Sequence, residues 1–234
     1  EGDDRSGFDL VDGASCRVVE LYAHGLDQSP AMRKVECALC LMLIVMQTAV
    51  IASIGTQLDE TRAGEIEAAG GRIVARSLDA RNEDEVTAFL GDADAHAPLE
   101  VTIFNVGANV NFPILDTTDR VFRKVWEMAC WAGFVSGRES ARLMLARGQG
   151  KIFFTGATAS LRGGSGFAAF ASAKFGLRAV AQSMARELMP KNIHVAHLII
   201  DSGVDTAWVR ERTPSFRRIV VTCAFTVGSP TESS

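Results

Sequence analysis

Apolar residues along the chain alternate between short continuous runs and segments with helical spacing. Lys151–Thr155 is a short apolar run bounded by glycines, which is typical of a buried strand. From Phe167 the apolar residues recur at helical spacing, and this pattern predicts a long helix that Pro190 ends. Ile193–Ile200 is apolar again and predicts the next buried strand.

The rest of the chain repeats this alternation. Further strands are predicted at Cys16–Tyr22, Thr48–Ile54, Arg72–Leu78, Val101–Phe104 and Ile219–Val227, and further helices at Asp59–Ala69, Asn82–Leu90 and Thr117–Arg147, the last capped by Thr117 or Thr118. Because strands and helices alternate without a hairpin signal, we expect an α/β fold with a doubly wound parallel sheet in a single domain. We expect this domain to span 16–228, with flexible segments at 1–15 and 229–234.

Composition narrows the class of protein. The chain has 234 residues, of which 47% are hydrophobic and 22% charged, as in one soluble domain with a full core. The net charge of −4 gives no basic stripe, so nucleic acid is not an expected partner. The five cysteines are irregularly spaced and do not form a disulfide framework, which predicts a cytoplasmic protein. Cys37 and Cys40 have no second pair, so we expect two buried thiols and no bound metal.

One apolar stretch has two interpretations. Cys37–Ile54 runs for 18 residues without a formal charge, which reaches the lower range for a membrane span. The competing interpretation is a buried helix that runs into the strand at Thr48–Ile54. Because Gln47 and Ser53 dilute the span and an α/β pattern follows at once, we favour the buried helix.

One charged residue interrupts the long helix's apolar face. Lys174 falls on the same face as Phe167, Phe170 and Leu177. A lysine in such a place either snorkels to water along its aliphatic stem or has a buried partner. Helical periodicity alone favours the snorkelling lysine.

The stretch around this lysine resembles a known family. Phe170-Ala-Ser-Ala-Lys174 follows a glycine loop at Gly163–Gly166, and Asp201-Ser-Gly-Val-Asp-Thr206 follows the next strand. Together they resemble the catalytic half of the short-chain dehydrogenase/reductase family, which carries Tyr-x-x-x-Lys on such a helix and Pro-Gly before a threonine. The resemblance spans about residues 48–212 and implies a Rossmann-like fold.

The resemblance implies a four-residue catalytic group, of which this chain keeps one member. In the family a tyrosine exchanges the proton, a lysine lowers its pKa and holds the nicotinamide ribose, a serine steadies the substrate oxygen and an asparagine completes the group. The lysine is Lys174, whereas Phe170 stands at the tyrosine position, Ala157 at the serine position and Cys130 at the asparagine position. The chain is therefore expected to be an atypical member, in which Thr158, Ser160 or water handles the proton.

The resemblance also implies a nucleotide site whose first half is not recognisable. The family's glycine-rich pyrophosphate loop is absent, since Gly25 is the only glycine between residues 14 and 54. Apart from Lys174, the family's cofactor contacts map to Asp79, Asn105, Gly107 and Thr206; for Asp79, the capping of a turn is an equal alternative. NAD or NADP is the implied cofactor. No acid follows the strand at Thr48–Ile54 until Asp59, which favours NADP.

Two functions follow from these residues. The first is an atypical NAD(P)-dependent oxidoreductase acting on a carbonyl or alcohol small molecule. The alternative is a catalytically inactive relative that senses a nucleotide or binds a protein partner. Small residues recur on the helices at 117–147 and 166–189, and the resemblance implies that these helices pair in a homodimer; internal packing is the alternative.

Overall fold

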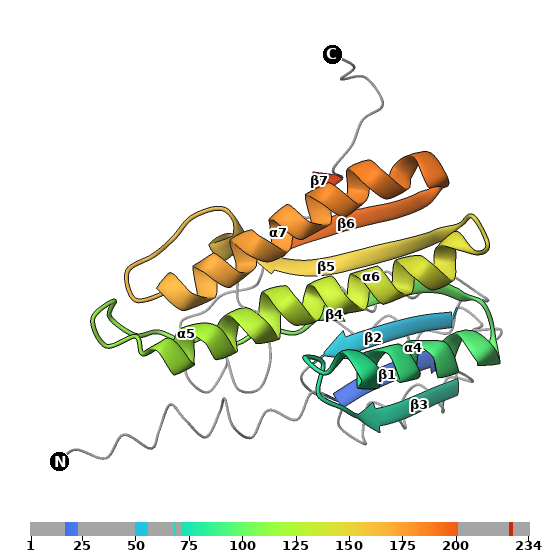
Figure 1. Cartoon of the computed structure of the whole chain (residues 1–234), viewed down its shortest axis with the longest axis horizontal. Coiled ribbons are helices and arrows are strands. Elements are labelled where there is room, and N and C mark those ends of the chain that lie inside the picture. The colour runs from blue at the N-terminus through green and yellow to red at the C-terminus, as the bar shows by residue number, and fades with distance from the viewer. Residues whose placement is uncertain (1–16, 23–49, 56–67, 69–71, 201–224, 227–234) are drawn as a thin grey trace.

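The computed structural model describes residues 17–22, 50–55, 68, 72–200 and 225–226. Their strands form one seven-stranded sheet in the order β3-β1-β2-β4-β5-β6-β7 (Figure 1). The strands are β1 (Arg17–Tyr22), β2 (Val50–Gly55), β3 (Arg72–Ser77), β4 (Leu99–Asn105), β5 (Gly150–Ala157), β6 (Ile193–Ile200) and β7 (Phe225–Thr226). The domain limits predicted at residues 16 and 228 lie outside the described residues.

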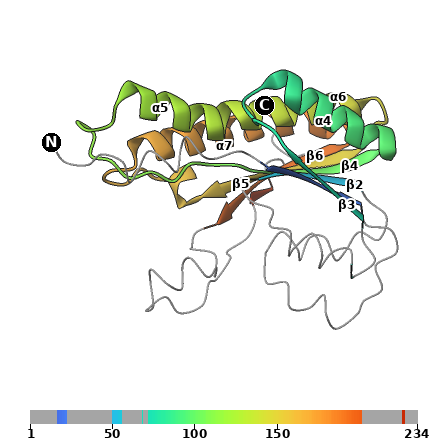
Figure 2. The same cartoon turned by 90° about the horizontal axis from the view of Figure 1, so that it is seen from below.

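The described helices cover one face of this sheet (Figure 2). They are α4 (Glu83–His96), α5 (Asp119–Trp126), α6 (Ala132–Leu145) and α7 (Ala168–Leu188). Short helical turns lie at Glu127–Trp131, Thr158–Ser160 and Met189–Lys191. None of the helices in the described part of the chain is long and apolar enough to cross a membrane. The predicted helix at Asp59–Ala69, apart from Ala68, and the apolar residues 37–49 lie outside that part.

The α/β fold class is confirmed, but the sheet is not entirely parallel. β2, β4, β5 and β6 pair in parallel, as the alternation of strands and helices predicted. β1 lies between β2 and β3 and pairs antiparallel with both, and the two-residue β7 pairs antiparallel with β6. The prediction of an all-parallel sheet was therefore wrong for β1 and β7. The short run Cys16–Tyr22 predicts a strand but does not say with which strands it pairs.

Helix α5 begins at one of the two polar caps that were expected for it. Thr118 accepts a hydrogen bond from the backbone N–H of Val121 and so caps α5, as predicted. The helix predicted at Asn82–Leu90 is longer in the structure, since α4 continues to His96. Gly91 does not end it, because the buried face formed by Phe89 and Leu90 continues beyond the glycine with Ala93. The long helical segment predicted at Thr117–Arg147 is α5 and α6 joined by a π-helical turn.

The core lies between the sheet and the α6–α7 layer. Phe104 on β4 and Phe154 on β5 are fully buried, with ring centroids 6.3 Å apart. Gly133 on α6 lets Leu177 of α7 pack against it, because a Cβ there would overlap the Leu177 side chain. This close approach fixes α7, and with it Lys174, against the ends of β4 and β5.

Candidate active site

The candidate site lies where the parallel strands β4 and β5 end. Such sheets bind ligands at the carboxyl ends of their strands. β4 ends at Asn105, which is exposed, and β5 ends at Ala157. Helix α7 packs against the turn that follows β5. The structure thus brings Asn105, Ala157 and Lys174 to the same edge of the sheet.

Lys174 points into the protein and does not snorkel. Its side chain is 5% exposed, so the interpretation favoured from periodicity was wrong. The ammonium donates a 2.8 Å hydrogen bond to the carbonyl of Thr155 on β5 and a 3.4 Å hydrogen bond to the carbonyl of Val106 after β4. Burial lowers the pKa of Lys174 from 10.5 to about 8. The amine still carries its proton at neutral pH, and it bridges the two strand ends.

Gly107 makes room for this lysine. A Cβ built on Gly107 would lie 3.2 Å from Lys174 Nζ and 3.3 Å from the neighbouring carbon. A larger residue would therefore press on the ammonium as it reaches the carbonyl of Val106. Sequence reasoning placed Gly107 at a cofactor site, and the structure adds its contact with Lys174.

The other positions of the expected catalytic group hold side chains without an ionisable proton near neutral pH. Phe170 is half-buried, and the centroid of its ring lies 6.0 Å from Lys174 Nζ. Ala157 is half-buried at the end of β5. Cys130 lies buried in the π-helical turn, against Gly176 of α7, and burial raises the pKa of its thiol.

Of the two candidate hydroxyls, Ser160 is buried and Thr158 is partly exposed. Both belong to the short 3₁₀ turn that follows β5. Ser160 is 0% exposed, and its Oγ accepts a 3.1 Å hydrogen bond from the backbone N–H of Ala157. This burial favours Thr158 as the hydroxyl that meets a substrate.

Two residues around this turn were not identified as site residues from the sequence. His197 on β6 is 1% exposed, and its Nε2 lies 3.4 Å from Ser160 Oγ. Arg178, one turn beyond Lys174 on α7, donates a 3.4 Å hydrogen bond to the carbonyl of Ser160. The available signal was a polar histidine within the apolar run that forms β6.

The loop after β4 and the loop before α7 are joined next to the site. The backbone N–H of Phe112 donates a 2.8 Å hydrogen bond to the carbonyl of Gly166, which joins the loop after β4 to the loop before α7. Gly166 has φ of 80° and lies against the side chain of Asn111. A glycine is needed here because other residues rarely adopt this backbone angle and a Cβ would meet Asn111.

Asp79, the predicted adenine contact, follows β3. Its carboxylate accepts hydrogen bonds from the backbone N–H and the guanidinium of Arg81, at 2.7–3.1 Å. These hydrogen bonds hold the pKa of Asp79 below its usual value. The carbonyl of Arg81 in turn accepts a 3.1 Å hydrogen bond from Trp131 Nε1, which fixes this loop to the helix layer. Both roles predicted for Asp79, adenine contact and turn residue, are compatible with this geometry.

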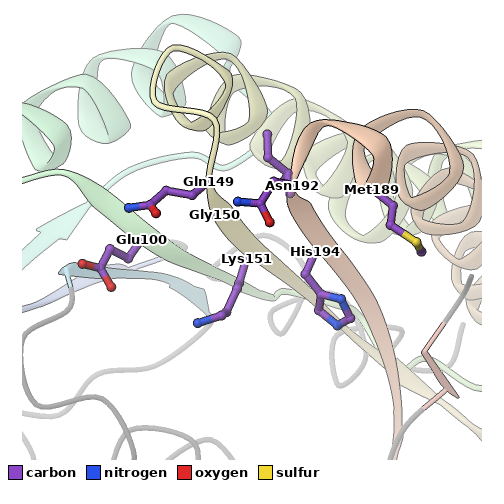
Figure 3. Close-up of a pocket in the computed structure, with 8 residues that line it drawn as sticks. Glu100, Gln149, Gly150, Lys151, Met189, Asn192 and His194 are labelled. Carbon is purple, nitrogen blue, oxygen red and sulfur yellow. The ribbon is translucent and has the colours of Figure 1, made fainter.

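A pocket of about 380 Å³ lies at the opposite edge of the sheet (Figure 3). Figure 3 shows Glu100, Lys151 and His194 around it, at the amino ends of β4, β5 and β6. Because ligands bind at the carboxyl ends of such strands, we do not assign the active site to this pocket. In the part of the chain that the structure describes, no cluster of three or more His, Cys, Asp or Glu side chains is placed to bind a metal. Thr206 lies outside that part.

Comparisons with known proteins agree with this architecture. A short-chain dehydrogenase from Rhodopseudomonas palustris is 79% identical over 73% of this chain and 81% of its own, with a TM-score of 0.62. A 2-dehydro-3-deoxy-D-gluconate 5-dehydrogenase from Pseudoalteromonas atlantica is 25% identical over 61% of this chain and 56% of its own length. Sorbitol-6-phosphate 2-dehydrogenase from Erwinia amylovora is 21% identical with a TM-score of 0.60, over 69% of this chain and 66% of its own, and it shares the fold.

The chain spans about half the length of the curated relatives that it matches. The family model that describes the short chain dehydrogenases matches residues 36–215, well over half of the chain. Members of this family bind NAD or NADP. The match covers the described strands β2 to β6 and the helices between them. The chain therefore belongs to the short-chain dehydrogenase/reductase family.

Proposed function

We propose that this chain is an atypical NAD(P)-dependent oxidoreductase that acts on a carbonyl or alcohol small molecule. The observation that carries the proposal is the buried ammonium of Lys174 at the carboxyl edge of the sheet. No carboxylate in the described part of the chain neutralises it, and two backbone carbonyls are its hydrogen-bond acceptors. An uncompensated buried cation is costly and is expected where it serves a site.

The residues of the site fit the nicotinamide half of such a nucleotide. Lys174 would bind the ribose hydroxyls. The exposed Asn105 and Gly107, which has no side chain, would line the cofactor site at the end of β4. Asp79 would meet the adenine, and Thr206 would contact the cofactor from the segment after β6. The nicotinamide, when bound, supplies or takes the hydride. The absence of an acid between β2 and Asp59 supports a preference for NADP.

The chain must manage the proton without a tyrosine. Phe170 and Ala157 have no proton to give. Thr158, or a water bound beside it, would donate to the substrate oxygen, while the positive charge on Lys174 stabilises the negative charge that develops there. A hydroxyl with an ordinary pKa is a poor acid, so we expect a slow enzyme, about 10²–10⁴-fold below one with a positioned acid.

Restoring the missing groups tests this proposal. We expect the double variant Phe170→Tyr/Ala157→Ser to raise kcat over the wild type, because a phenol at position 170 would lie beside the Lys174 ammonium. The gain should disappear when Lys174→Met is added, and Phe175→Tyr, on the exposed side of the same helix, should give none. A panel of carbonyls and alcohols with NADPH and NADH supplies the assay. A double variant without turnover on the whole panel contradicts the proposal.

The inactive alternative has its own support in the three replaced positions, Phe170, Ala157 and Cys130. A relative that keeps the lysine and loses the acid would bind a nucleotide without turning it over. Nucleotide binding by a wild type that shows no turnover, together with a double variant that gains activity, would identify such a sensor. Turnover by the wild type would exclude it.

We propose a homodimer through the helix layer that α5 and α7 form. Phe122 and Trp126 on α5 and Phe175 on α7 are 39–42% exposed, and Trp126 lies beside Gly176 of α7. By contrast, the small residues Gly133 and Gly137 on α6 pack internally. Light scattering should give a dimer mass for the wild type and a monomer mass for Trp126→Glu. A monomeric wild type would contradict the pairing.

The cytoplasmic location is also a proposal. It rests on the irregular spacing of the five cysteines, of which Cys130 is a buried free thiol. Thiol labelling of the denatured protein isolated without reductant should modify all five cysteines. Protection of a pair would count against a reducing compartment.

A further inference from the structure

The turn after β5 is held to the body of the protein from three sides, all through Ser160. The Oγ of Ser160 accepts the N–H of Ala157, and the Nε2 of His197 lies 3.4 Å from the same oxygen. The carbonyl of Ser160 accepts a hydrogen bond from Arg178. These contacts join the turn to β5, to β6 and to α7. We refer to Ser160, His197 and Arg178 as the turn anchor.

The position of His197 depends on a glycine in the neighbouring strand. β5 and β6 pair in parallel, with Phe154 beside His197. Gly156 lies next to the imidazole, and a Cβ there would overlap the ring. The missing side chain therefore creates the space in which the ring lies, 1% exposed, beneath the turn.

The imidazole is neutral. Burial, with the positive charges of Lys174 and Arg178 acting in the same direction, lowers its pKa from 6.5 to about 4. A neutral ring has one donor and one acceptor. Because the N–H of Ala157 already donates to Ser160 Oγ, the hydroxyl proton is available for Nε2 of His197.

This arrangement carries a cost that packing alone does not explain. The Nδ1 of His197 is buried and has no hydrogen-bond partner in the described structure. A buried polar group without a partner is unfavourable, so an apolar side chain in this space would avoid that penalty. The hydrogen bond to Ser160 offsets this penalty, and it fixes the turn that carries Thr158.

The anchor and Lys174 hold neighbouring peptide groups of the same strand end. Lys174 binds the carbonyl of Thr155, and Ser160 binds the N–H of Ala157. We infer that His197, acting through Ser160, is a positioning residue that fixes the Thr158 turn beside Lys174. This inference rests on the proposed function, because it matters to catalysis only if Thr158 meets the substrate.

Hydrogen exchange on the full chain tests the anchor without any substrate. His197→Phe keeps a ring of similar size and removes the hydrogen bond, and Ser160→Ala removes the hydroxyl while leaving the ring. In both variants we expect the amide of Ala157 and those of the turn to exchange about tenfold faster, as loss of one hydrogen bond implies. His194→Phe is the matched control, because His194 lies on the same strand and outside the anchor, and it should leave these rates unchanged.

Kinetics then separate positioning from simple destabilisation. We expect kcat of His197→Phe to fall about tenfold while the Kd for the nucleotide stays constant, and His197→Gln, whose amide can meet the hydroxyl, to recover part of the loss. Unchanged exchange in both His197→Phe and Ser160→Ala overturns the inference. If exchange is faster in both variants and the wild type binds no nucleotide, the anchor exists and the proposed function is wrong.

Discussion

Replacing Lys174 should change how the stability of the protein depends on pH. The amine has a pKa of about 8 in the folded protein and 10.5 in the unfolded chain. Between these two values the unfolded chain binds more protons than the folded protein, so the free energy of unfolding rises with pH. The fall in pKa corresponds to roughly 3 kcal/mol over the full window at 1.36 kcal/mol per pH unit, an upper bound.

The change to Lys174→Met removes the titrating group and keeps most of the side-chain volume. Other groups titrate in both proteins, so the informative quantity is the difference in unfolding free energy between wild type and variant. This difference should move in favour of the wild type by about 2 kcal/mol between pH 7 and pH 9.5. Urea denaturation at a series of pH values measures it.

Lys191→Met serves as the control, because Lys191 is exposed just after α7. Its difference from the wild type should stay constant over the same pH range. A Lys174→Met difference that is equally flat would refute the argument, since it would mean that the amine reaches water as a snorkelling lysine does.

Three further predictions concern the same half of the molecule. Gly156→Ala should destabilise the protein by about 1–3 kcal/mol through overlap with the His197 ring, whereas Gly163→Ala, which has open space around it, should not; urea denaturation compares them. Thr118→Ala should cost about 1 kcal/mol by removing the cap of α5, and an unchanged denaturation midpoint would contradict the cap. Thr158→Val should lower kcat with little change in the Kd for the nucleotide. An unchanged kcat would mean that water, and not Thr158, donates the proton to the substrate oxygen.

The strands and helices of the catalytic half were predictable because their signals are local. Gly150 and Gly156 bound the apolar run within β5, Pro190 follows the end of α7, and the apolar run 193–200 coincides with β6. The direction of β1 was not predictable, because one short run does not say which strands become its neighbours. The π-helical turn between α5 and α6 was missed because the residues around it follow α-helical spacings of three or four, as Trp126, Cys130, Gly133 and Gly137 do.

The candidate site was predictable only in part. The family resemblance located Lys174, yet its burial depends on the carbonyls of Thr155 and Val106, which no side-chain pattern reveals. The pairing of Ser160 with His197 joins residues 37 positions apart, on a turn and a strand that meet only in the folded sheet. Sequence reasoning therefore identified the charged group and missed the contacts that position the turn beside it.

The central claim is that a nicotinamide nucleotide binds over Lys174, and a thermal-shift titration with NADPH and NADH tests it most directly. At about 100 times Kd the nucleotide should stabilise the wild type by about 2.7 kcal/mol. We expect this shift with at least one nucleotide in the wild type and in Lys191→Met, and its loss at the same concentration in Lys174→Met. A folded wild type that shifts with neither nucleotide, or a Lys174→Met variant that shifts as much as the wild type, would contradict the account.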